Sequence, residues 1–416
     1  MPNKIMQWNE LTSFGNPTRS QAVNEMIKLV RKFEVRGQGA ESKARRPLRE
    51  AEFRAMIAQM RQAHDIETKY LLPALMTFQF HMIGRIDDCC KWRRENLAIH
   101  EVHDKAAKAR LAWSKNVTDE RAAPWQHVFG CMDFVFCVLL NVGLFLEVFH
   151  DRHHNARVRP MVFGLSEITD DAERAGDDGK AKVYSLLRPF FNAIGVDHTE
   201  ENNKLGSHST RKYASTWTRS NGISKDDKDH RGRWKSKRIS DGYDDVQLDW
   251  IDAKVAQVLC PGGVCAYEVV DPGCTNEWIS AHVMPHIAVV FGNGLAILFG
   301  KAILWLAFSA HYDLMPQDMR NRIVTAYESV RTTEGAAQPV KKRLVTVTGH
   351  EAQVFMEVVG HEEHVNNNGD NGPIPVTPEN PNGRSAPSRQ VLLSLMAQTN
   401  SLRWAIAEQN NTLELL

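Results

Sequence analysis

The sequence predicts an α+β fold that is mainly helical and contains a small β-hairpin or sheet. Most apolar residues recur at helical spacing, and only a short part of the chain, near residues 96–113, alternates between apolar and polar residues as a strand does. Of the 416 residues, 43% are hydrophobic and 24% are charged, which is typical of globular domains and excludes a mainly disordered protein. The length suffices for two or three domains with their own cores.

Three helices are expected in the first part of the chain. Residues 19–36 have an apolar face, and a basic linker follows them. A second helix is expected to begin at Arg49, because Glu50 and Glu52 place acidic residues in its first turn. The apolar run 68–85 predicts a third helix that ends at Arg85.

The middle of the chain changes period and then returns to helices. Short strands are expected over 96–103 and 110–113, where apolar and polar residues alternate between turns. The run 134–149 is apolar on nearly all sides, which indicates a core helix. Further along, the pattern predicts a polar loop over 170–182 and helices over 183–194 and 207–221.

One apolar segment, residues 287–308, is long enough to span a membrane. It contains Asn293, Lys301 and three glycines, and a charge in the middle of a bilayer costs about 3 kcal/mol. We therefore expect a buried strand–turn–helix or core helix here and no membrane partner. The amino terminus has no apolar segment of the kind found in secretory signals.

Charge is balanced over the whole chain but not locally. Lys and Arg total 51 against 50 Asp and Glu, so the net charge is +1. From Lys204 to Ser240, however, eleven Lys/Arg face three Asp, which is the local excess that binding to a phosphodiester backbone requires. The seven cysteines have no regular spacing, which favours a reducing compartment over a disulfide framework.

The same basic stretch contains residues suited to phosphoryl transfer. His208 and Arg211 form a His-x-x-Arg pair, Trp234 follows Gly232 and Arg233, and Tyr243 comes nine residues after Trp234. Arginine donates two parallel hydrogen bonds to a phosphate, and such fixed cations stabilise the charge of the transition state. A tyrosine nucleophile conserves the bond energy in a phosphotyrosine, so a strand can be rejoined without ATP.

The order of these residues resembles the tyrosine recombinase (phage integrase) superfamily. His208, Arg211, Trp234 and Tyr243 match its later boxes. The first box arginine, which follows an apolar helix and precedes an acidic residue by three, is matched by Arg85 with Asp88 in FQFHMIGRIDD. The segments RIDDCCKWRRENL, LAWSKNV and GRWKSKRISDGYDD look most like recombinases of Crypton transposons.

This resemblance implies the tyrosine recombinase catalytic fold and a role for each matched residue. Arg85 and Arg211 would bind the scissile phosphate, His208 and Trp234 would support it, and Tyr243 would form the 3′-phosphotyrosine. Lys115, which lies where the family has a lysine-bearing β-hairpin, would protonate the leaving 5′-oxygen. Asp88 would position Arg85 or His208.

The resemblance also implies the partners and the location. The expected partner is double-stranded DNA, bound by a homo-oligomer that is a tetramer in this family, with no cofactor, no metal and no small-molecule substrate. A nuclear location follows from the DNA partner. Six further cations in the basic stretch are expected to contact DNA: Lys204, Lys212, Arg233, Lys235, Lys237 and Arg238.

The expected organisation places the catalytic domain between two other parts. Only a short segment precedes Arg49, so we expect a shortened remnant of the family's amino-terminal core-binding domain. The Asn-, Pro- and Gly-rich stretch near the carboxyl end predicts a linker, and the leucines after it a helix that could form a coiled coil. The expected parts are 1–48 (remnant and basic linker), 49–250 (catalytic domain), 251–358 (Crypton-type extension), 359–389 (disordered linker) and 390–416 (carboxyl-terminal helix).

A second function remains open at this point. A domesticated or truncated protein could keep the recombinase fold and bind DNA as a regulator without cutting it. Loss of catalytic residues would favour that alternative, whereas this chain retains every residue type that cleavage needs.

Overall fold

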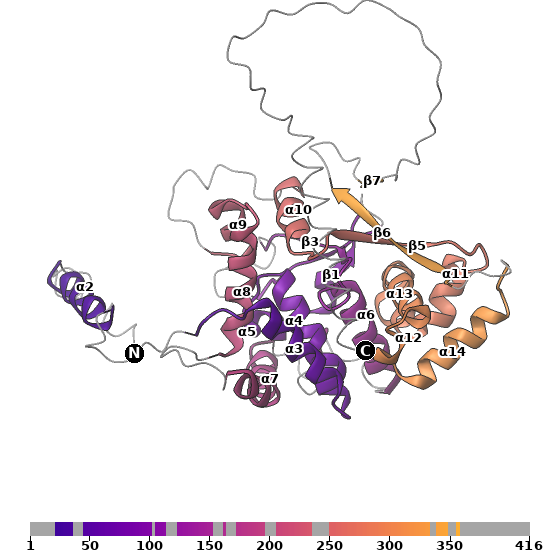
Figure 1. Ribbon diagram of the computed structural model, residues 1–416, viewed down its shortest axis with the longest axis horizontal. Helices are drawn as coiled ribbons and strands as arrows, with labels where there is room; N and C mark the ends of the chain where they lie inside the picture. The colour runs from indigo at the N-terminus through magenta and orange to yellow at the C-terminus, as the bar shows by residue number, and fades with distance from the viewer. Residues whose placement is uncertain are drawn as a thin grey trace, which may run out of the picture.

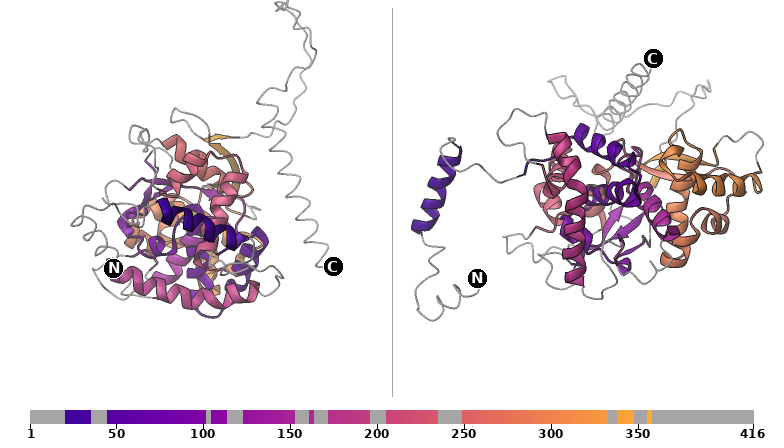
Figure 2. Two further views of the ribbon diagram at one scale, coloured as in Figure 1. Left: turned by 90° about the vertical axis from the view of Figure 1, so that its left-hand side faces the viewer. Right: turned by 90° about the horizontal axis from the view of Figure 1, so that it is seen from below.

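The computed structural model confirms an α+β protein that is mostly helical with small antiparallel sheets. It describes residues 21–35, 45–101, 105–113, 123–152, 161–163, 172–195, 205–234, 249–332, 338–347 and 355–357. Figure 1 shows α8 and α9 on the opposite side of the molecule from α12, α13 and α14, and the second view in Figure 2 agrees.

Helix α4 (Leu72–His81) lies at the centre of the fold, and all ten of its residues are buried. It continues a π-helical segment, Glu67–Leu71, and packs against α3 (Glu50–Arg61), α6 (Val138–Arg152) and α8 (Ser207–Ser220). The helix predicted over 68–85 ends earlier than expected, because the chain turns at Ile83, which has a φ of 44°. Arg85 consequently precedes the first residue of a new short helix, α5 (Ile86–Cys90).

Helix α7 (Ala172–Gly195) corrects one expectation from the sequence. The polar stretch 170–182 was predicted to be a loop, but the helix already begins at Ala172. Further along the helix, Val183 and Leu187 are buried in the core. The predicted helices over 183–194 and 207–221 are confirmed by α7 and α8.

Two small antiparallel sheets complete the fold. β1 (Leu97–Ile99), β2 (Ala107–Ala109) and β3 (Gln126–Val128) form the first sheet, so the second predicted strand lies before 110–113 rather than within it. The second sheet has the order β4-β5-β6-β7. Its strands are β4 (Gly130–Cys131), β5 (Val264–Val269), β6 (Val340–Val347) and β7 (Phe355–Glu357).

The region after residue 250 shares its core with the region before it. β5 pairs with β4, and α13 (Asn293–Phe308) packs on α6, so one continuous apolar core crosses the boundary expected at 250/251. The segment 287–308 forms parts of α12 (Pro285–Phe291) and α13, with a break at Gly292, which has a φ of 88°. This confirms a core helix. None of the helices in the described ranges is both long and apolar enough to cross a membrane.

Helix α2 (Gln21–Val35) confirms the first predicted helix, although Met26, Ile27, Leu29 and Val30 on it are exposed, Met26 by 64%. The segments 359–389 and 390–416 lie outside the described residues. The other helices of the described chain are α9 (Lys225–Arg231), α10 (Asp249–Val258), α11 (Asn276–Trp278), α14 (Gln317–Glu328), the 3₁₀ turns Arg94–Asn96 and Tyr312–Leu314, and the π-helical turn Ile279–Val283.

Candidate DNA-cleavage site

Helix α8 presents His208 and Arg211 from its first turn. The chain enters the helix through Gly206 in an extended conformation, and the Gly206 amide donates to Ser209 Oγ at 3.0 Å. A second hydrogen bond fixes this end of the helix to the segment before α3: Leu48 N donates to Ser209 O at 3.2 Å. His208 is exposed, whereas Arg211, three residues later, points inward and is 6% exposed.

Arg211 has one guanidinium nitrogen bound and one available. Its Nη2 donates to Gly232 O at 2.6 Å, and its Nη1 is buried with no hydrogen-bond partner among the described residues. Burial, followed by the charges of Arg233 and Arg85, lowers the pKa of Arg211 to about 10. The group therefore stays charged at pH 7, and an unpaired buried cation of this kind is stabilised by an anion.

Trp234 covers the guanidinium of Arg211. The Arg211 carbon Cζ lies 4.3 Å from the centre of the Trp234 ring, and Lys228 Nζ lies 4.9 Å from it. The ring can fold back here because Gly232 has no side chain: a Cβ on Gly232 would be 1.8 Å from the ring. The glycine two residues before Trp234 is thus required by close packing, and the tryptophan holds two cations by cation–π contacts.

Arg85 and Asp88 approach the same place from α5. Arg85 Nη1 lies 3.9 Å from Asp88 Oδ2, and Asp88 is buried. The charge of Arg85 lowers the pKa of both His208 and Arg211, while that of Asp88 raises the pKa of Arg211. Arg85 and Asp88, which are far from His208 and Arg211 in the sequence, are therefore close enough for their charges to act on these residues.

The site has an excess of positive charge that acts on His208. Burial, together with Arg211, Arg85, Lys180 and Lys212, lowers the pKa of the His208 imidazole. The ring is consequently neutral at pH 7, and in that form one nitrogen can accept a proton. A neutral histidine beside two arginines suits a site for a phosphate and an oxygen nucleophile.

Two residues of this site could not be found from the sequence patterns. Lys180 on α7 is close enough for its charge to act on His208 and Cys90, but it stands in a stretch that looked like a loop. Gln79 is buried in α4, and its Nε2 donates to Gly84 O at 3.2 Å and to Ser207 O at 2.9 Å. It joins the residue before Arg85 to the residue before His208.

Two of the cations expected to contact DNA have other partners. Arg233 is 7% exposed, and its nitrogens donate to Gln126, Arg231 and Met82, so its position is structural rather than on a DNA-facing surface. Lys212 is exposed, but its Nζ donates to the carbonyl of Arg45. Six predicted site residues lie outside the described residues: Lys115, Tyr243, Lys204, Lys235, Lys237 and Arg238.

Two tyrosines near the site can be compared with Tyr243. Tyr213 is buried among Phe53, Phe80 and Phe136, and burial raises the pKa of its hydroxyl, which makes it a poor nucleophile. Tyr184 on α7 is exposed and hydrogen-bonds Ser207 Oγ, so it lies one residue from His208.

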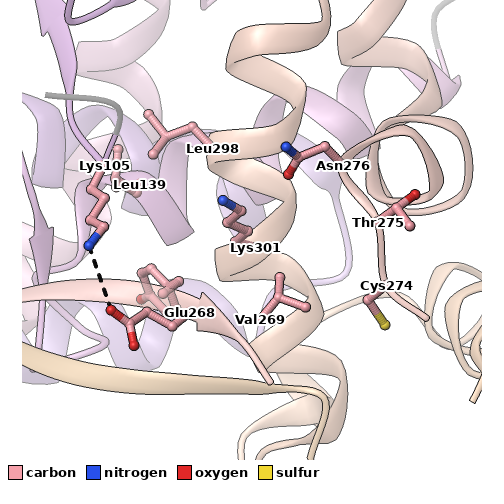
Figure 3. Close-up of a pocket in the computed structure, with 10 residues that line it drawn as sticks. Lys105, Leu139, Glu268, Val269, Cys274, Thr275, Asn276, Leu298 and Lys301 are labelled. Carbon is pink, nitrogen blue, oxygen red and sulfur yellow. Dashed lines mark ion pairs between the residues drawn. The ribbon is translucent and has the colours of Figure 1, made fainter. Parts of the chain in front are cut away.

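A separate cavity of about 350 Å³ lies between β5, α11 and α13 (Figure 3). Lys105 and Glu268 form a 3.6 Å ion pair at one side of it, and Lys301 lies on its α13 wall.

No described group of three or more His, Cys, Asp or Glu side chains could hold a metal ion. All seven cysteines are buried as free thiols.

Comparison with known proteins does not identify a family for this chain. No protein-family model, curated protein or solved structure matches the chain.

Proposed function

We propose that this protein cleaves and rejoins DNA strands through a 3′-phosphotyrosine formed by Tyr243. The observation that supports it best is the buried, partly unpaired guanidinium of Arg211, with Arg85, His208 and Trp234 around it. Such a site binds a tetrahedral anion, and the resemblance to tyrosine recombinases of the Crypton type specifies a backbone phosphate.

In the proposed reaction, the same side chains act in strand cleavage and, in reverse, in strand rejoining. The Tyr243 oxygen attacks phosphorus as its proton passes to a base, for which the neutral His208 is suited. The bond to the 5′-oxygen breaks, and Lys115 supplies the proton to the leaving hydroxyl. Arg85 and Arg211 stabilise the charge on the non-bridging oxygens. Reversal of these steps by another 5′-hydroxyl rejoins the strand.

The assembly and location belong to the same proposal. Recombination requires the chain to act on two duplexes, which in the family is done by a homo-tetramer, and nuclear DNA would be its partner. The structure describes one chain, and its basic site faces outward from α5 and α8 through the exposed His208.

The test is covalent trapping on a pool of nicked duplexes with random sequence around the nick. Wild-type protein should form a protein–DNA adduct that resists denaturation, and Tyr243→Phe should abolish it. Tyr184→Phe is the matched control, since it removes the exposed tyrosine hydroxyl beside Ser207 and should leave the adduct intact.

The other outcomes are equally specific. An adduct that survives Tyr243→Phe but disappears in Tyr184→Phe would reassign the nucleophile to α7. If wild-type protein shifts the duplexes in a gel and never forms an adduct, the chain is a DNA-binding regulator without cleavage activity and the proposal is wrong.

A further inference from the structure

The turn that precedes Arg85 has an unusual conformation. Helix α4 ends at His81, Ile83 has a φ of 44°, and Met82, Ile83 and Gly84 are buried. Positive φ is disfavoured for a β-branched residue, so such a turn persists only where its surroundings hold it. The carbonyls at the end of a buried helix also need donors that the helix itself does not supply.

Three buried side chains supply those donors. Arg231 Nε donates to His81 O at 2.9 Å, Arg233 Nη2 donates to Met82 O at 3.2 Å, and Gln79 Nε2 donates to Gly84 O at 3.2 Å. We call Gln79, Arg231 and Arg233 the turn clamp. Each carbonyl on which they act lies within four residues of Arg85.

The same three side chains are joined to the other half of the site. Gln79 also donates to Ser207 O, beside His208. Arg231 and Arg233 flank Gly232, whose carbonyl accepts the 2.6 Å hydrogen bond from Arg211.

The segment that contains the two clamp arginines is itself fixed. Arg231 is fully buried and donates to Asp252 Oδ1 at 2.5 Å and to His127 O at 2.9 Å. Gln126 donates to Arg231 O at 2.8 Å and accepts from Arg233 Nη1 at 2.7 Å. Arg233 has a φ of 54°, so this segment is strained in the same way as the turn that it contacts.

We propose that the turn clamp positions Arg85 relative to Arg211 and His208, and so sets the spacing of the anion site; this rests on the proposed function only in identifying the anion as a DNA phosphate. The physical need is repulsion between like charges: besides burial, the charges of Arg233 and Arg85 lower the pKa of Arg211, and cations this close would separate if nothing held them. The clamp residues do not touch the phosphate and are positioning residues.

The clamp can be tested without changing charge or volume. Arg233→Lys keeps the positive charge beside Arg211 but removes the planar fork that reaches Met82 and Gln126 together. Gln79→Met keeps the side-chain volume but removes both of its hydrogen bonds. Tyr327→Phe is the matched control, because it also removes one buried hydrogen bond, to Asp271, far from the site.

The first measurement is affinity for tungstate, a tetrahedral anion of the shape of phosphate, by titration calorimetry below the unfolding temperature of every variant. We expect Arg233→Lys and Gln79→Met to weaken tungstate binding about tenfold or more, and Tyr327→Phe to leave it unchanged. A purely structural clamp would lower the melting temperature of all three and leave tungstate affinity the same, which would overturn the proposal. Wild-type protein that binds tungstate no better than Arg211→Met would overturn it as well.

The second measurement separates the clamp from the proposed function. In the trapping assay, the two clamp variants should form adduct at least tenfold more slowly than wild type at saturating DNA, with little change in DNA affinity. If wild type forms no adduct while tungstate affinity still depends on Gln79 and Arg233, the proposed cleavage function is wrong and the positioning role of the turn clamp is supported. If wild type forms adduct and both variants match its rate, the positioning role of the turn clamp is wrong and the proposed cleavage function is supported.

Discussion

The site region and the carboxyl-terminal region use buried charge in opposite ways. We define the site region as the turn before Arg85, α5, α8 and the segment 231–234, and the carboxyl-terminal region as residues 259–347. In the site region, the buried charges are mostly arginines that donate to backbone carbonyls. In the carboxyl-terminal region, the buried carboxylate Asp271 accepts from Tyr327 at 2.7 Å, Thr332 at 2.7 Å and Gly273 at 2.9 Å.

The difference indicates which region is better suited to bind an anion. Asp271 has a donor for each of its oxygens, so its charge is satisfied within the protein. In the site region, Asp88 pairs with Arg85 and Asp252 pairs with Arg231, whereas the charges of Arg233 and Arg85 lower the pKa of the buried Arg211. The residual positive charge, together with the unpaired Nη1 of Arg211, is what an anionic substrate would neutralise.

Among changes that compare the two regions, the largest effect is expected from Gly232→Ala. The φ of Gly232 is −77°, so its backbone accepts alanine, but the new Cβ would be 1.8 Å from the Trp234 ring and must displace it from Arg211. We expect adduct formation to slow by about tenfold to a hundredfold, measured in single-turnover trapping. DNA affinity, which depends mainly on charge, should change much less.

Gly300→Ala in α13 is the matched change in the carboxyl-terminal region. A Cβ there would lie 2.4 Å from Ile279 Cγ2, so crowding is comparable in kind. This variant should lose about 1–3 kcal/mol of stability and keep its adduct rate at a temperature where it is folded. Equal loss of rate in both variants would mean that the two regions do not differ in the way described above.

A middle-sized effect is expected from Asp271→Asn. Replacing the carboxylate weakens three hydrogen bonds and should cost about 2–3 kcal/mol of unfolding free energy at pH 7, measured by chemical denaturation. Tyr327→Phe removes only one of these bonds and should cost about 1 kcal/mol. Neither variant should alter adduct formation below its melting temperature, and a slower rate would show that this region also shapes the site.

The pH dependence of Asp271→Asn has a definite sign. Hydrogen bonds from Thr332, Tyr327 and Gly273, which outweigh the opposing effect of burial, lower the pKa of Asp271 from 3.8 to about 2. A lowered carboxyl pKa contributes stability that is present above 3.8 and is lost as the pH falls through about 2. The stability difference between wild type and Asp271→Asn should therefore shrink from pH 4 to pH 2.

Much of the fold was predictable because apolar periodicity reports burial. The fully buried α4, the largely buried α6 and the core helix α13 follow from their sequence patterns. The end of α4 was placed wrongly, since nothing in the letters FQFHMIGR shows that Ile83 adopts a positive φ. Likewise, the beginning of α7 has a polar sequence, and a polar sequence without apolar periodicity does not distinguish a helical turn from a loop.

The site was predictable only where residue types stand at fixed spacing. The resemblance implied that Arg85, His208, Arg211 and Trp234 converge; in the structure Trp234 stacks on Arg211, and the charge of Arg85 acts on His208 and Arg211. Gln79 and Arg231 could not have been found, because buried donors to backbone carbonyls leave no repeating pattern in a sequence. Arg233 was misjudged for the same reason: a basic stretch indicates DNA contacts, but composition does not say which of its cations turn inward.

The smallest effect expected is on the pH dependence of stability, and it concerns two histidines. His286 lies beside negative charges, whereas His208 lies beside positive charges. A hydrogen bond that His286 donates to Glu147, together with the charges of Glu147 and Asp151, raises the pKa of His286, although burial and Arg322 oppose this. A raised histidine pKa gives stability that is fully present below 6.5 and is lost as the pH rises through the higher, folded-state value. His286→Gln should therefore cost stability at pH 6, by at most about 1 kcal/mol because the His286 side chain is 34% exposed, and cost less at pH 8.5.

His208 should show the reverse dependence, because burial, Arg211 and Arg85 lower its pKa. A lowered histidine pKa means that folding favours the neutral ring, so the stability due to His208 falls as the pH drops below 6.5. Thermal melts of wild type, His286→Gln and His208→Gln between pH 5.5 and 8.5 measure both trends. A bound tetrahedral anion should weaken the dependence at His208, because negative charge favours the protonated ring, and leave that at His286 unchanged. If tungstate alters both equally, the excess positive charge is not confined to the site region.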